Sequence, residues 1–247
     1  MRGKGGPVRV GRALDDPDAK RALNERLFTT IAREYPWMTK VLSLGRDAAW
    51  KRRLVQELPD MSRPVCVDLA CGTGDITRLL AGRFRDGTVT GQDLTGAMLD
   101  EARRRTPQPN ARYEQRDMTA TGLRSGSVDI VTAGYTLRNA PALDDALSEV
   151  ARILRPGGHA AFLDFVRWPG RLTGWAELLV LRLWGSFWGL LLHRNPAIYG
   201  YIAASLRRFP TPPELRERLR AHGLTPVSTI PCFLGFTAII IVRKEAA

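Results

Sequence analysis

The sequence has few of the residues that hold metals or disulfides. Its 247 residues include three histidines and three cysteines (Cys66, Cys71 and Cys232), and no two cysteines form a C-x-x-C pair. A structural zinc site needs about four such ligands at close spacing, so we expect no metal. A disulfide framework is equally absent, which is typical of a reducing compartment. These absences predict a cytoplasmic protein without a metal centre.

The sequence also lacks a signal peptide and an uninterrupted membrane-spanning run. Its first 20 residues are polar and glycine-rich, with no apolar segment, and we expect residues 1–18 to form a flexible basic tail. The longest apolar stretch, residues 170–196, contains Glu177 and Arg182. Each would cost about 2.5–3.5 kcal/mol at the centre of a bilayer. We therefore expect a lid over the sheet; the alternative is peripheral membrane contact through Trp175, Trp184 and Trp188.

Acidic residues are scarce relative to basic ones. There are 37 lysines and arginines against 25 aspartates and glutamates, which gives a net charge of +12. A basic surface favours polyanions such as nucleic acid or anionic lipid. Most of this charge comes from arginine in an alanine-rich chain, a composition typical of GC-rich genomes, and no separate basic recognition domain is evident. We expect no nucleic-acid partner, and anionic lipid is the candidate for the tail residues Arg2, Lys4, Arg9 and Arg12.

Strands and helices alternate through the middle of the chain. Short valine-rich runs typical of buried parallel strands are followed by amphipathic stretches. Expected strands cover residues 64–70, 87–94, 111–118, 127–137 and 159–166; expected helices cover 19–58 with a break at Pro36, 75–84, 96–106 and 142–156, the last stopped by Pro156, Gly157 and Gly158. Residues 226–244 are expected to form an antiparallel hairpin. The pattern predicts an α/β, Rossmann-like fold with helices on both faces of a mostly parallel sheet.

A glycine-rich loop, "VDLACGTGD", follows the first of these strands. Gly72 and Gly74 allow a ligand to approach the backbone, as in nucleotide-binding folds. The third glycine of the dinucleotide pattern G-x-G-x-x-G is missing, and Asp75 at the helix start would repel a phosphate. A ligand with adenosine but no pyrophosphate fits better, which predicts S-adenosyl-L-methionine.

Acidic residues stand at the ends of successive strands. Asp93 closes the second strand about 20 residues past the glycines, where an acid accepts both ribose hydroxyls. Asp117 closes the third strand and can accept from the adenine amino group, with Met118 beside the ring. Asp68 lies inside the first strand, near the sulfonium and amino-acid part. Three such acids after one G-x-G loop strengthen the cofactor prediction.

Longer motifs narrow the prediction to a family. "VCVDLACGTGDITRLLA", "GQDLTGAMLDEARRR", "AGYTLRNAPALDDALSEVARILRPGGHAAFLDF" and "YGYIAASLRRFPTPPELRERLRAHGL" occur in order, after "IAREYPWMTKVLSLGRDAAWKRR". Together they resemble the ubiquinone/menaquinone biosynthesis C-methyltransferase family from about Phe28 onward. The resemblance implies a class I fold with a seven-stranded sheet. It also implies methyl transfer to a ring carbon of a polyprenylated quinol precursor, a hydrophobic aromatic substrate.

The resemblance also implies roles for individual residues. It places ribose and adenine contacts at Asp93, Asp117 and Met118, backbone contacts at Thr73 and Gly134, and the substrate at Arg138, Asn139 and Tyr35. The neighbouring loop residues Ala70, Cys71, Leu94 and Tyr135 complete the predicted cofactor site. Because a phenol has a pKa near 10, we expect Arg138 to stabilise its anion, Asn139 to orient the hydroxyl, and Tyr35 or a water to carry the proton. Predicted substrate contacts on the apolar lid are Trp184, Trp188, His193 (also an alternative base), Tyr199 and Tyr201.

Some positions depart from the family pattern. Pro36 and Thr39 stand where the family has Asp and Asn, Cys71 replaces a glycine, and "DFVRWPG" follows the fifth strand. A natural-product methyltransferase acting on oxygen, nitrogen or carbon, and a cofactor-holding enzyme of cyclisation or rearrangement, therefore remain alternatives. The expected organisation is a tail, N-terminal helices (19–60), a cofactor core (61–168), an apolar helical cap (169–210) and a C-terminal helix with the hairpin (211–247). The sequence does not decide between a monomer and a homodimer.

Overall fold

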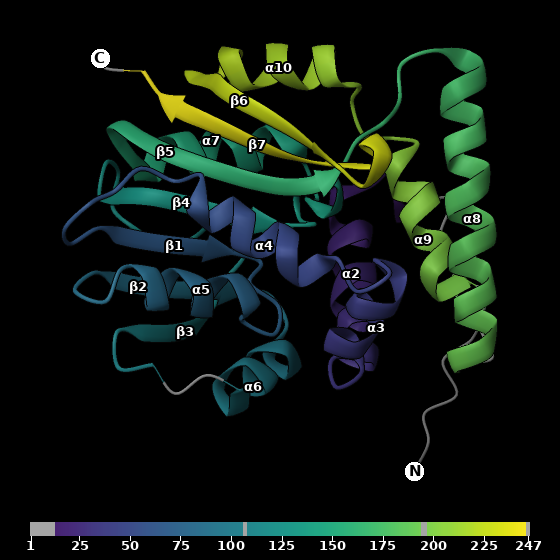
Figure 1. The fold of residues 1–247 in the computed structure, drawn as a ribbon, viewed down its shortest axis with the longest axis horizontal. Coiled ribbons are helices and arrows are strands. Elements are labelled where there is room, and N and C mark those ends of the chain that lie inside the picture. Colours follow the sequence, from purple (N-terminus) through teal and green to yellow (C-terminus); the bar gives the residue numbers. More distant parts are fainter. Residues whose placement is uncertain (1–12, 106–107, 194–196, 246–247) are drawn as a thin grey trace.

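A seven-stranded sheet organises the molecule (Figure 1). The computed structural model describes residues 13–105, 108–193 and 197–245, and the side chains of residues 192–200 are outside that description. The strands follow the order β3-β2-β1-β4-β5-β7-β6. They are β1 (Val65–Leu69), β2 (Thr88–Asp93), β3 (Ala111–Gln115), β4 (Val128–Gly134), β5 (Leu154–Phe165), β6 (Leu224–Cys232) and β7 (Thr237–Lys244).

Helices flank the sheet and stand at one edge of it. They are α2 (Pro17–Ile31), α3 (Tyr35–Leu42), α4 (Asp47–Gln56), α5 (Asp75–Arg83), α6 (Gly96–Arg105), α7 (Leu143–Ile153), α8 (Arg171–His193), α9 (Ala197–Leu206) and α10 (Pro212–Ala221). Two short 3-10 turns, η1 (Leu137–Asn139) and η2 (Phe233–Gly235), follow β4 and β6. Asp16 caps α2 by accepting from the Ala19 amide, so this helix begins before the expected residue 19. The predicted lipid-binding tail residues Arg2, Lys4, Arg9 and Arg12 lie outside the described residues.

The sheet has the expected mixture of strand directions. Strands β1 to β5 pair in parallel, and β7 is antiparallel to both β5 and β6. Alternate residues of β1 point to opposite faces, so Val67 belongs to the hydrophobic cluster that includes α7 and α10, while Cys66 belongs to the cluster that includes α4 and α5. Strand order reverses between β1 and β4, where a doubly wound fold opens a crevice for ligands at the carboxyl ends of its strands. The predicted fold is confirmed.

Several expected boundaries are wrong. Pro36, the expected helix break, lies in the first turn of α3, and the breaks fall at residues 32–34 and 43–46 instead. The strand expected to reach Leu137 ends at Gly134.

The helix expected to reach Pro156 ends at Ile153, because Leu154 is extended and pairs with Val128 as the first residue of β5. Proline disfavours helical backbone at the residue before it, so Pro156 ends the helix upstream rather than at its own position. The Pro-Gly-Gly segment is therefore the start of the strand.

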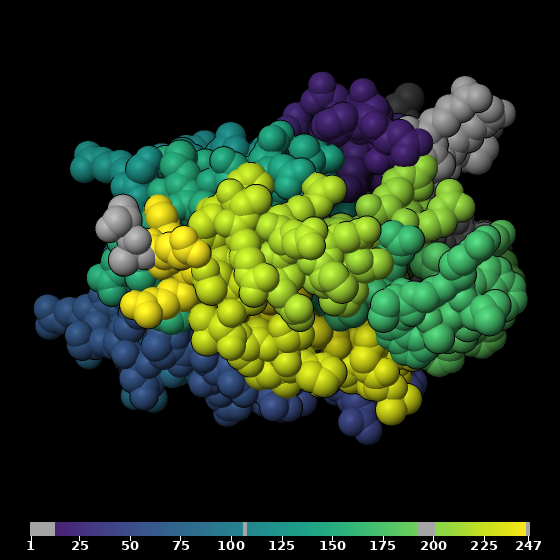
Figure 2. Space-filling model, turned by 90° about the horizontal axis from the view of Figure 1, so that it is seen from above, coloured from purple at the N-terminus to yellow at the C-terminus, as the bar shows by residue number. Residues whose placement is uncertain are grey.

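Four helices cover the carboxyl edge of the parallel strands. Helices α2 and α3 lie between the sheet and the pair α8 and α9, and α8 forms the outer border of the molecule (Figures 1 and 2). Glu177 interrupts the apolar character of α8 and is buried. No helix within the described residues has the length and hydropathy to cross a bilayer. The apolar stretch forms α8, which packs against α9 beside the carboxyl ends of the strands (Figure 1).

Candidate functional site

The loop after β1 has an unusual backbone. Ala70, Gly72 and Gly74 have φ angles of 46°, 54° and 78°, and the Cys71 amide donates to the Gln92 carbonyl at 2.9 Å. A Cβ on Gly74 would lie 2.5 Å from the Tyr113 hydroxyl oxygen. Only glycine fits there without displacement of Tyr113. The loop thus presents bare backbone at the end of β1, as the G-x-G motif predicts.

Asp93 lies opposite that loop. Its carboxylate accepts from the Gly72 amide and from the Thr95 amide, both at 2.8 Å. Burial raises the pKa of Asp93, and these two amides oppose that shift. Asp93 and Leu94 line a pocket of about 90 Å³ together with Gly134. The amides hold the carboxylate at this edge of the pocket, where a ribose diol would meet it.

The predicted adenine end of the pocket is covered by α2. Asp117 accepts from Arg21 of α2 at 2.6 Å and from the Thr119 amide at 2.8 Å. Met118 and Asn24 line the same pocket. Arg21 therefore competes with any other donor for Asp117. No local sequence pattern indicates this contact, because Arg21 and Asp117 are 96 residues apart.

Asp68 lies deeper, within β1. It accepts from the Thr77 hydroxyl at 2.7 Å and the Thr132 hydroxyl at 2.8 Å. Burial raises its pKa to about 6, while these hydroxyls oppose the shift. Together with Cys71 and Thr73 it lines a small inner pocket of about 30 Å³. Asp68 thus joins β1 to α5 and β4 beneath the glycine loop.

These residues fit an adenosyl cofactor. Bare backbone, the anchored Asp93 carboxylate, and Asp117 with Met118 stand at the ends of three successive strands. The expected repulsion of phosphate by Asp75 is weakened, because the charge of Asp75 is balanced by basic neighbours. Its carboxylate is paired with Lys51, Arg105 and Arg78 at 3.0, 3.2 and 3.5 Å. Asp75 acts mainly as an anchor, so the missing third glycine is the stronger argument against a dinucleotide.

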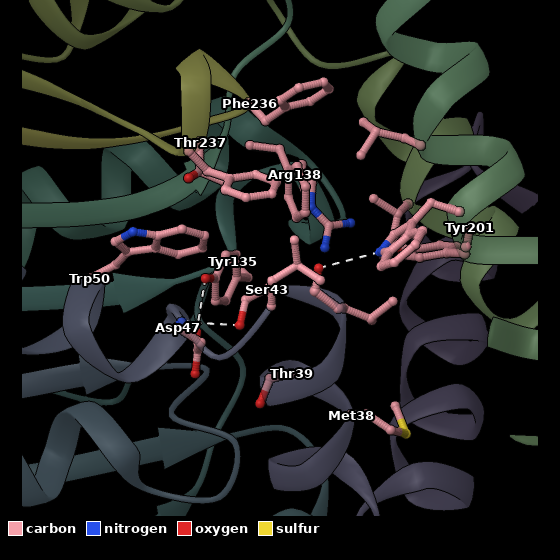
Figure 3. Close-up of a pocket in the computed structure, with 18 of the residues that line it drawn as sticks. Met38, Thr39, Ser43, Asp47, Trp50, Tyr135, Arg138, Tyr201, Phe236 and Thr237 are labelled. Carbon is pink, nitrogen blue, oxygen red and sulfur yellow. Dashed lines mark hydrogen bonds between the residues drawn. The ribbon is translucent and has the colours of Figure 1, made fainter. Parts of the chain in front are cut away.

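A second, apolar cavity of about 360 Å³ adjoins the cofactor pocket (Figure 3). Its walls come from α2, α3, α4, α8, α9, η2 and the ends of β4, β5 and β7. Tyr35 and Tyr135 line both this cavity and the cofactor pockets. Among its lining residues, Asp47 and Arg138 are the two that carry charge. A hydrophobic acceptor in this cavity would lie against the cofactor site.

Arg138 is one of those two charges, and it is 7% exposed. Its Nε lies 3.3 Å from Asp164 and its Nη1 donates to Ser205 at 2.9 Å. The ring of Phe165 lies 5.1 Å from the guanidinium. Asp164 thus holds Arg138 at the cavity wall, and a surface arginine in an arginine-rich chain is ruled out. Burial raises the pKa of Asp164, which Arg138 opposes.

The other two predicted catalytic residues differ in position. Asn139 lines the cofactor pocket rather than the acceptor cavity, and its side-chain amide donates to the Tyr135 carbonyl at 2.8 Å. That bond supports Tyr135, whose φ of 58° is strained for a tyrosine. Tyr35 lines both pockets, and burial raises its pKa to about 12. Proton transfer through an ionised Tyr35 is therefore costly.

The predicted lid contacts separate into three groups. Trp184 and Tyr201 line the acceptor cavity, and the Tyr201 hydroxyl donates to Asn24. Trp188 instead packs beside Met98 and Met38, outside that cavity. The side chains of His193 and Tyr199 lie outside the described residues.

Sequence reasoning missed a buried charged network beside the cavity. Lys51 is paired with Asp47 at 2.7 Å and with Asp75 at 3.0 Å, and Tyr135 donates to Asp47 at 2.8 Å. The spacing of Asp47 and Lys51 in "RDAAWK", four residues apart on a helix, was the one available signal. Within the described residues no group of three or more His, Cys, Asp or Glu side chains could hold a metal ion.

The comparisons with known proteins agree with this geometry. The model of the ubiE/COQ5 methyltransferase family matches residues 17–244. A 2-phytyl-1,4-naphthoquinone methyltransferase of Thermosynechococcus vestitus is 35% identical over 89% of this chain and 98% of its own length. A demethylmenaquinone methyltransferase of Lactobacillus johnsonii is 32% identical over 89% of this chain and 91% of its own.

Solved structures show the same fold. A geranyl diphosphate C-methyltransferase of Streptomyces coelicolor, in complex with S-adenosyl-L-homocysteine, superposes with a TM-score of 0.62. It shares 17% identity over 80% of this chain and 79% of that one. The likeness supports the sheet and its flanking helices.

Proposed function

Because the chain belongs to the ubiE/COQ5 methyltransferase family and is an S-adenosyl-L-methionine-dependent methyltransferase, we propose that it methylates a ring carbon of a quinol with an apolar tail. The relatives named for 2-phytyl-1,4-naphthoquinone and demethylmenaquinone match nearly the whole chain. A polycyclic or prenylated quinol is therefore the acceptor class with the strongest support.

The apolar cavity is the observation that carries this proposal. Its lining includes Phe28, Met38, Trp50 and Trp184, and its two charges are Asp47 and Arg138. Sites for small ligands are typically apolar, with a few polar groups that fix orientation. Such a cavity suits an aromatic ring with a hydrocarbon tail.

The cavity residues can prepare that ring for reaction. S-adenosyl-L-methionine, when bound, supplies a methyl group activated by a sulfonium. Arg138 stabilises negative charge on a ring oxygen, and that charge makes the neighbouring ring carbons nucleophilic. Tyr35 and Tyr135, shared by both pockets, position the ring and keep water away from it.

Methylation of a defined quinol tests the proposal. Purified protein is incubated with reduced 2-phytyl-1,4-naphthoquinone and methyl-labelled S-adenosyl-L-methionine. We expect one labelled methyl in the product, located on a ring carbon by NMR. Methylation on oxygen would instead support the natural-product alternative, and a product of unchanged mass would support a rearrangement.

We further propose that the exposed face of α8 contacts a membrane surface. Leu172, Trp175, Leu183, Phe187 and Leu190 are exposed on this helix. Arg171 and Arg182 are exposed as well, whereas Glu177 is buried, so the exposed face is apolar and basic. Its neighbours Leu181 and Trp184 line the acceptor cavity, which makes the face continuous with the cavity wall. These features favour an anionic bilayer that carries the acceptor's tail.

Vesicle co-sedimentation tests this contact. We expect binding to vesicles with anionic lipid, reduced at high salt, and weakened by Phe187→Ser with Leu190→Ser. The matched control is Val227→Ser, an equally apolar exposed residue on β6. Unchanged vesicle binding, together with a shift from dimer to monomer in the double variant, would identify the face as a homodimer interface instead.

A further inference from the structure

A buried chain of polar groups leads away from the acceptor cavity. It starts at the Tyr135 hydroxyl, which donates to Asp47 Oδ1 at 2.8 Å (Figure 3). Asp47 Oδ2 pairs with Lys51 Nζ at 2.7 Å, and Lys51 pairs with Asp75 Oδ2 at 3.0 Å. Asp47 and Lys51 are 6% exposed each. Asp47, Lys51 and Asp75 also line an outer pocket of about 280 Å³, together with Arg105. The chain thus connects the cavity with the outside of the protein.

The direction of the first hydrogen bond matters. Because the Tyr135 proton is donated to Asp47, the lone pairs of the tyrosine oxygen are available toward the cavity that Tyr135 lines. A hydroxyl of the acceptor could donate to that oxygen. Burial, and then Asp47, raise the pKa of Tyr135 well above its usual value, so Tyr135 remains a neutral hydroxyl. Tyr135 can therefore pass its proton to Asp47 only while it receives a proton from the acceptor hydroxyl.

We propose that Asp47 is the general base that removes the hydroxyl proton of the acceptor, with Tyr135 as the relay. The acceptor's O–H bond breaks as its proton moves to Tyr135 Oη, and the Tyr135 O–H bond breaks as its proton moves to Asp47 Oδ1. One negative charge moves from the carboxylate to the acceptor oxygen. This inference rests on the proposed methylation of a phenolic ring.

The surrounding charges make that transfer feasible. In water an aspartate has a pKa of about 4 and a phenol one of about 10, so the phenolate must be stabilised. Arg138, the other charge of the cavity, provides a positive neighbour. Protonation of Asp47 would ordinarily leave a buried cation without a partner. Here Lys51 keeps its pair with Asp75. The titratable and charged groups that share a contact or a pocket with Asp47 are Tyr35, Tyr135, Tyr201, Lys51, Asp75, Arg138, Lys40, Arg52, Arg78 and Arg105.

Two variants test the base and its relay. Asp47→Asn removes the charge but keeps the shape, and Tyr135→Phe removes only the hydroxyl. With reduced 2-phytyl-1,4-naphthoquinone as probe, we expect each to lower kcat by about 10²–10⁴-fold. Affinity for S-adenosyl-L-homocysteine, measured by calorimetry, should stay near that of the wild type. The control Asp144→Asn alters an exposed carboxylate of α7 and should leave kcat unchanged.

Further readouts separate a catalytic role from a structural one. If both residues serve one step, the double variant should be no slower than the slower single variant. The kcat of Asp47→Asn should rise in proportion to hydroxide concentration, because solvent base replaces the carboxylate, whereas the wild type should reach a plateau.

The outcomes distinguish this inference from the proposed function. Suppose the wild-type enzyme methylates the quinol. If both variants then keep their kcat, or if Asp47→Asn keeps the wild-type pH profile, the role of Asp47 as base is wrong and the proposed function stands. A wild-type enzyme that methylates no ring carbon would overturn the proposed function and this role with it. If Asp47→Asn fails to fold, the kcat of Tyr135→Phe tests the relay: a loss of about 10²-fold or more supports it, and an unchanged kcat overturns it.

Discussion

The cofactor half and the acceptor half of the site are built in different ways. The cofactor half uses mainly the loops that follow β1, β2, β3 and β4, with α2 covering its predicted adenine end. Its acids accept from backbone amides and hydroxyls of adjacent strands and loops, as Asp93 does from Gly72 and Thr95, and Asp117 is also held by Arg21 of α2. The acceptor half instead brings together helices from both ends of the chain around an apolar space.

This difference determines what each half tolerates. Short-range hydrogen bonds with fixed geometry leave little freedom at Asp93 or Gly74. An apolar wall made of Phe28, Trp50 and Trp184 depends on shape and volume, and several side chains can fill the same space. Substitutions should therefore alter acceptor choice readily while cofactor binding persists. The predictions below test that separation.

Loss of Arg138 should affect catalysis most and leave the cofactor half intact. We expect Arg138→Ala to lower kcat by about 10²–10³-fold, because the charge that stabilises the ring oxygen is lost. Affinity for S-adenosyl-L-homocysteine should change by less than about threefold, an expectation from the separation of the two pockets. Turnover and calorimetry on the same preparation measure both quantities.

Folding has to be controlled in that experiment. Removal of Arg138 leaves Asp164 buried without its cation, which can cost about 3–5 kcal/mol of unfolding free energy. Arg138→Lys keeps a charge and should fold, yet it loses the planar guanidinium and should remain slow. Arg220→Ala, on the outer helix α10, is the matched arginine control. Equal collapse of cofactor affinity and turnover would mean that the halves are not separable.

Sequence reasoning succeeded where the determinants are local. The alternation of strands and helices, the G-x-G loop, and the position of Asp93 at the end of β2 depend on neighbours within one or two elements. The resemblance to the family is confirmed by the match over residues 17–244. The roles assigned to single residues stay predictions.

The acceptor half could not be predicted in the same way. Its pairs are distant in sequence, such as Tyr135 with Asp47 at a separation of 88 residues. Position within one loop was also misleading, because Arg138 lines the acceptor cavity whereas Asn139 lines the cofactor pocket. Periodicity shows which face of an element is apolar but not which distant face it meets. This is why Asp47, Lys51 and Asp164 were not singled out.

A change at Asp93 should have the reverse effect of a change at Arg138. We expect Asp93→Ala to weaken cofactor binding by about 10–100-fold, which corresponds to the loss of about 1.5–3 kcal/mol from hydrogen bonds to a charged group. The turnover that remains at saturating cofactor should fall much less. Calorimetry with S-adenosyl-L-homocysteine and cofactor-dependent kinetics measure these effects. The control is Asp86→Asn, an exposed carboxylate in the turn before β2. Retained affinity would show that Asp93 supports the loop only.

The last prediction concerns stability rather than activity, through the attachment of the acceptor half to the core. Glu177 of α8 accepts from the Trp168 amide at 2.8 Å, and Trp168 in turn donates to the Gly235 carbonyl of η2. Burial raises the pKa of Glu177 to about 7, although the Trp168 amide opposes that shift. The unfolded chain releases this proton near pH 4.5, whereas the folded protein keeps it to about pH 7. The protonated side chain therefore stabilises the folded state below pH 4.5, and that contribution is lost as the pH rises through 7.

Glu177→Gln should remove this pH dependence, because glutamine keeps an acceptor for the Trp168 amide but does not ionise. Relative to the wild type, the variant should gain up to about 3 kcal/mol of unfolding free energy between pH 5 and pH 8. Urea unfolding at several pH values measures the difference. Glu149→Gln is the matched control: Arg152 and the Thr121 hydrogen bonds overcome burial and lower the pKa of Glu149, so this variant should differ from the wild type by a constant amount over the same range. A constant difference for Glu177→Gln as well would show that the cap is attached to the core without a buried, protonated carboxyl.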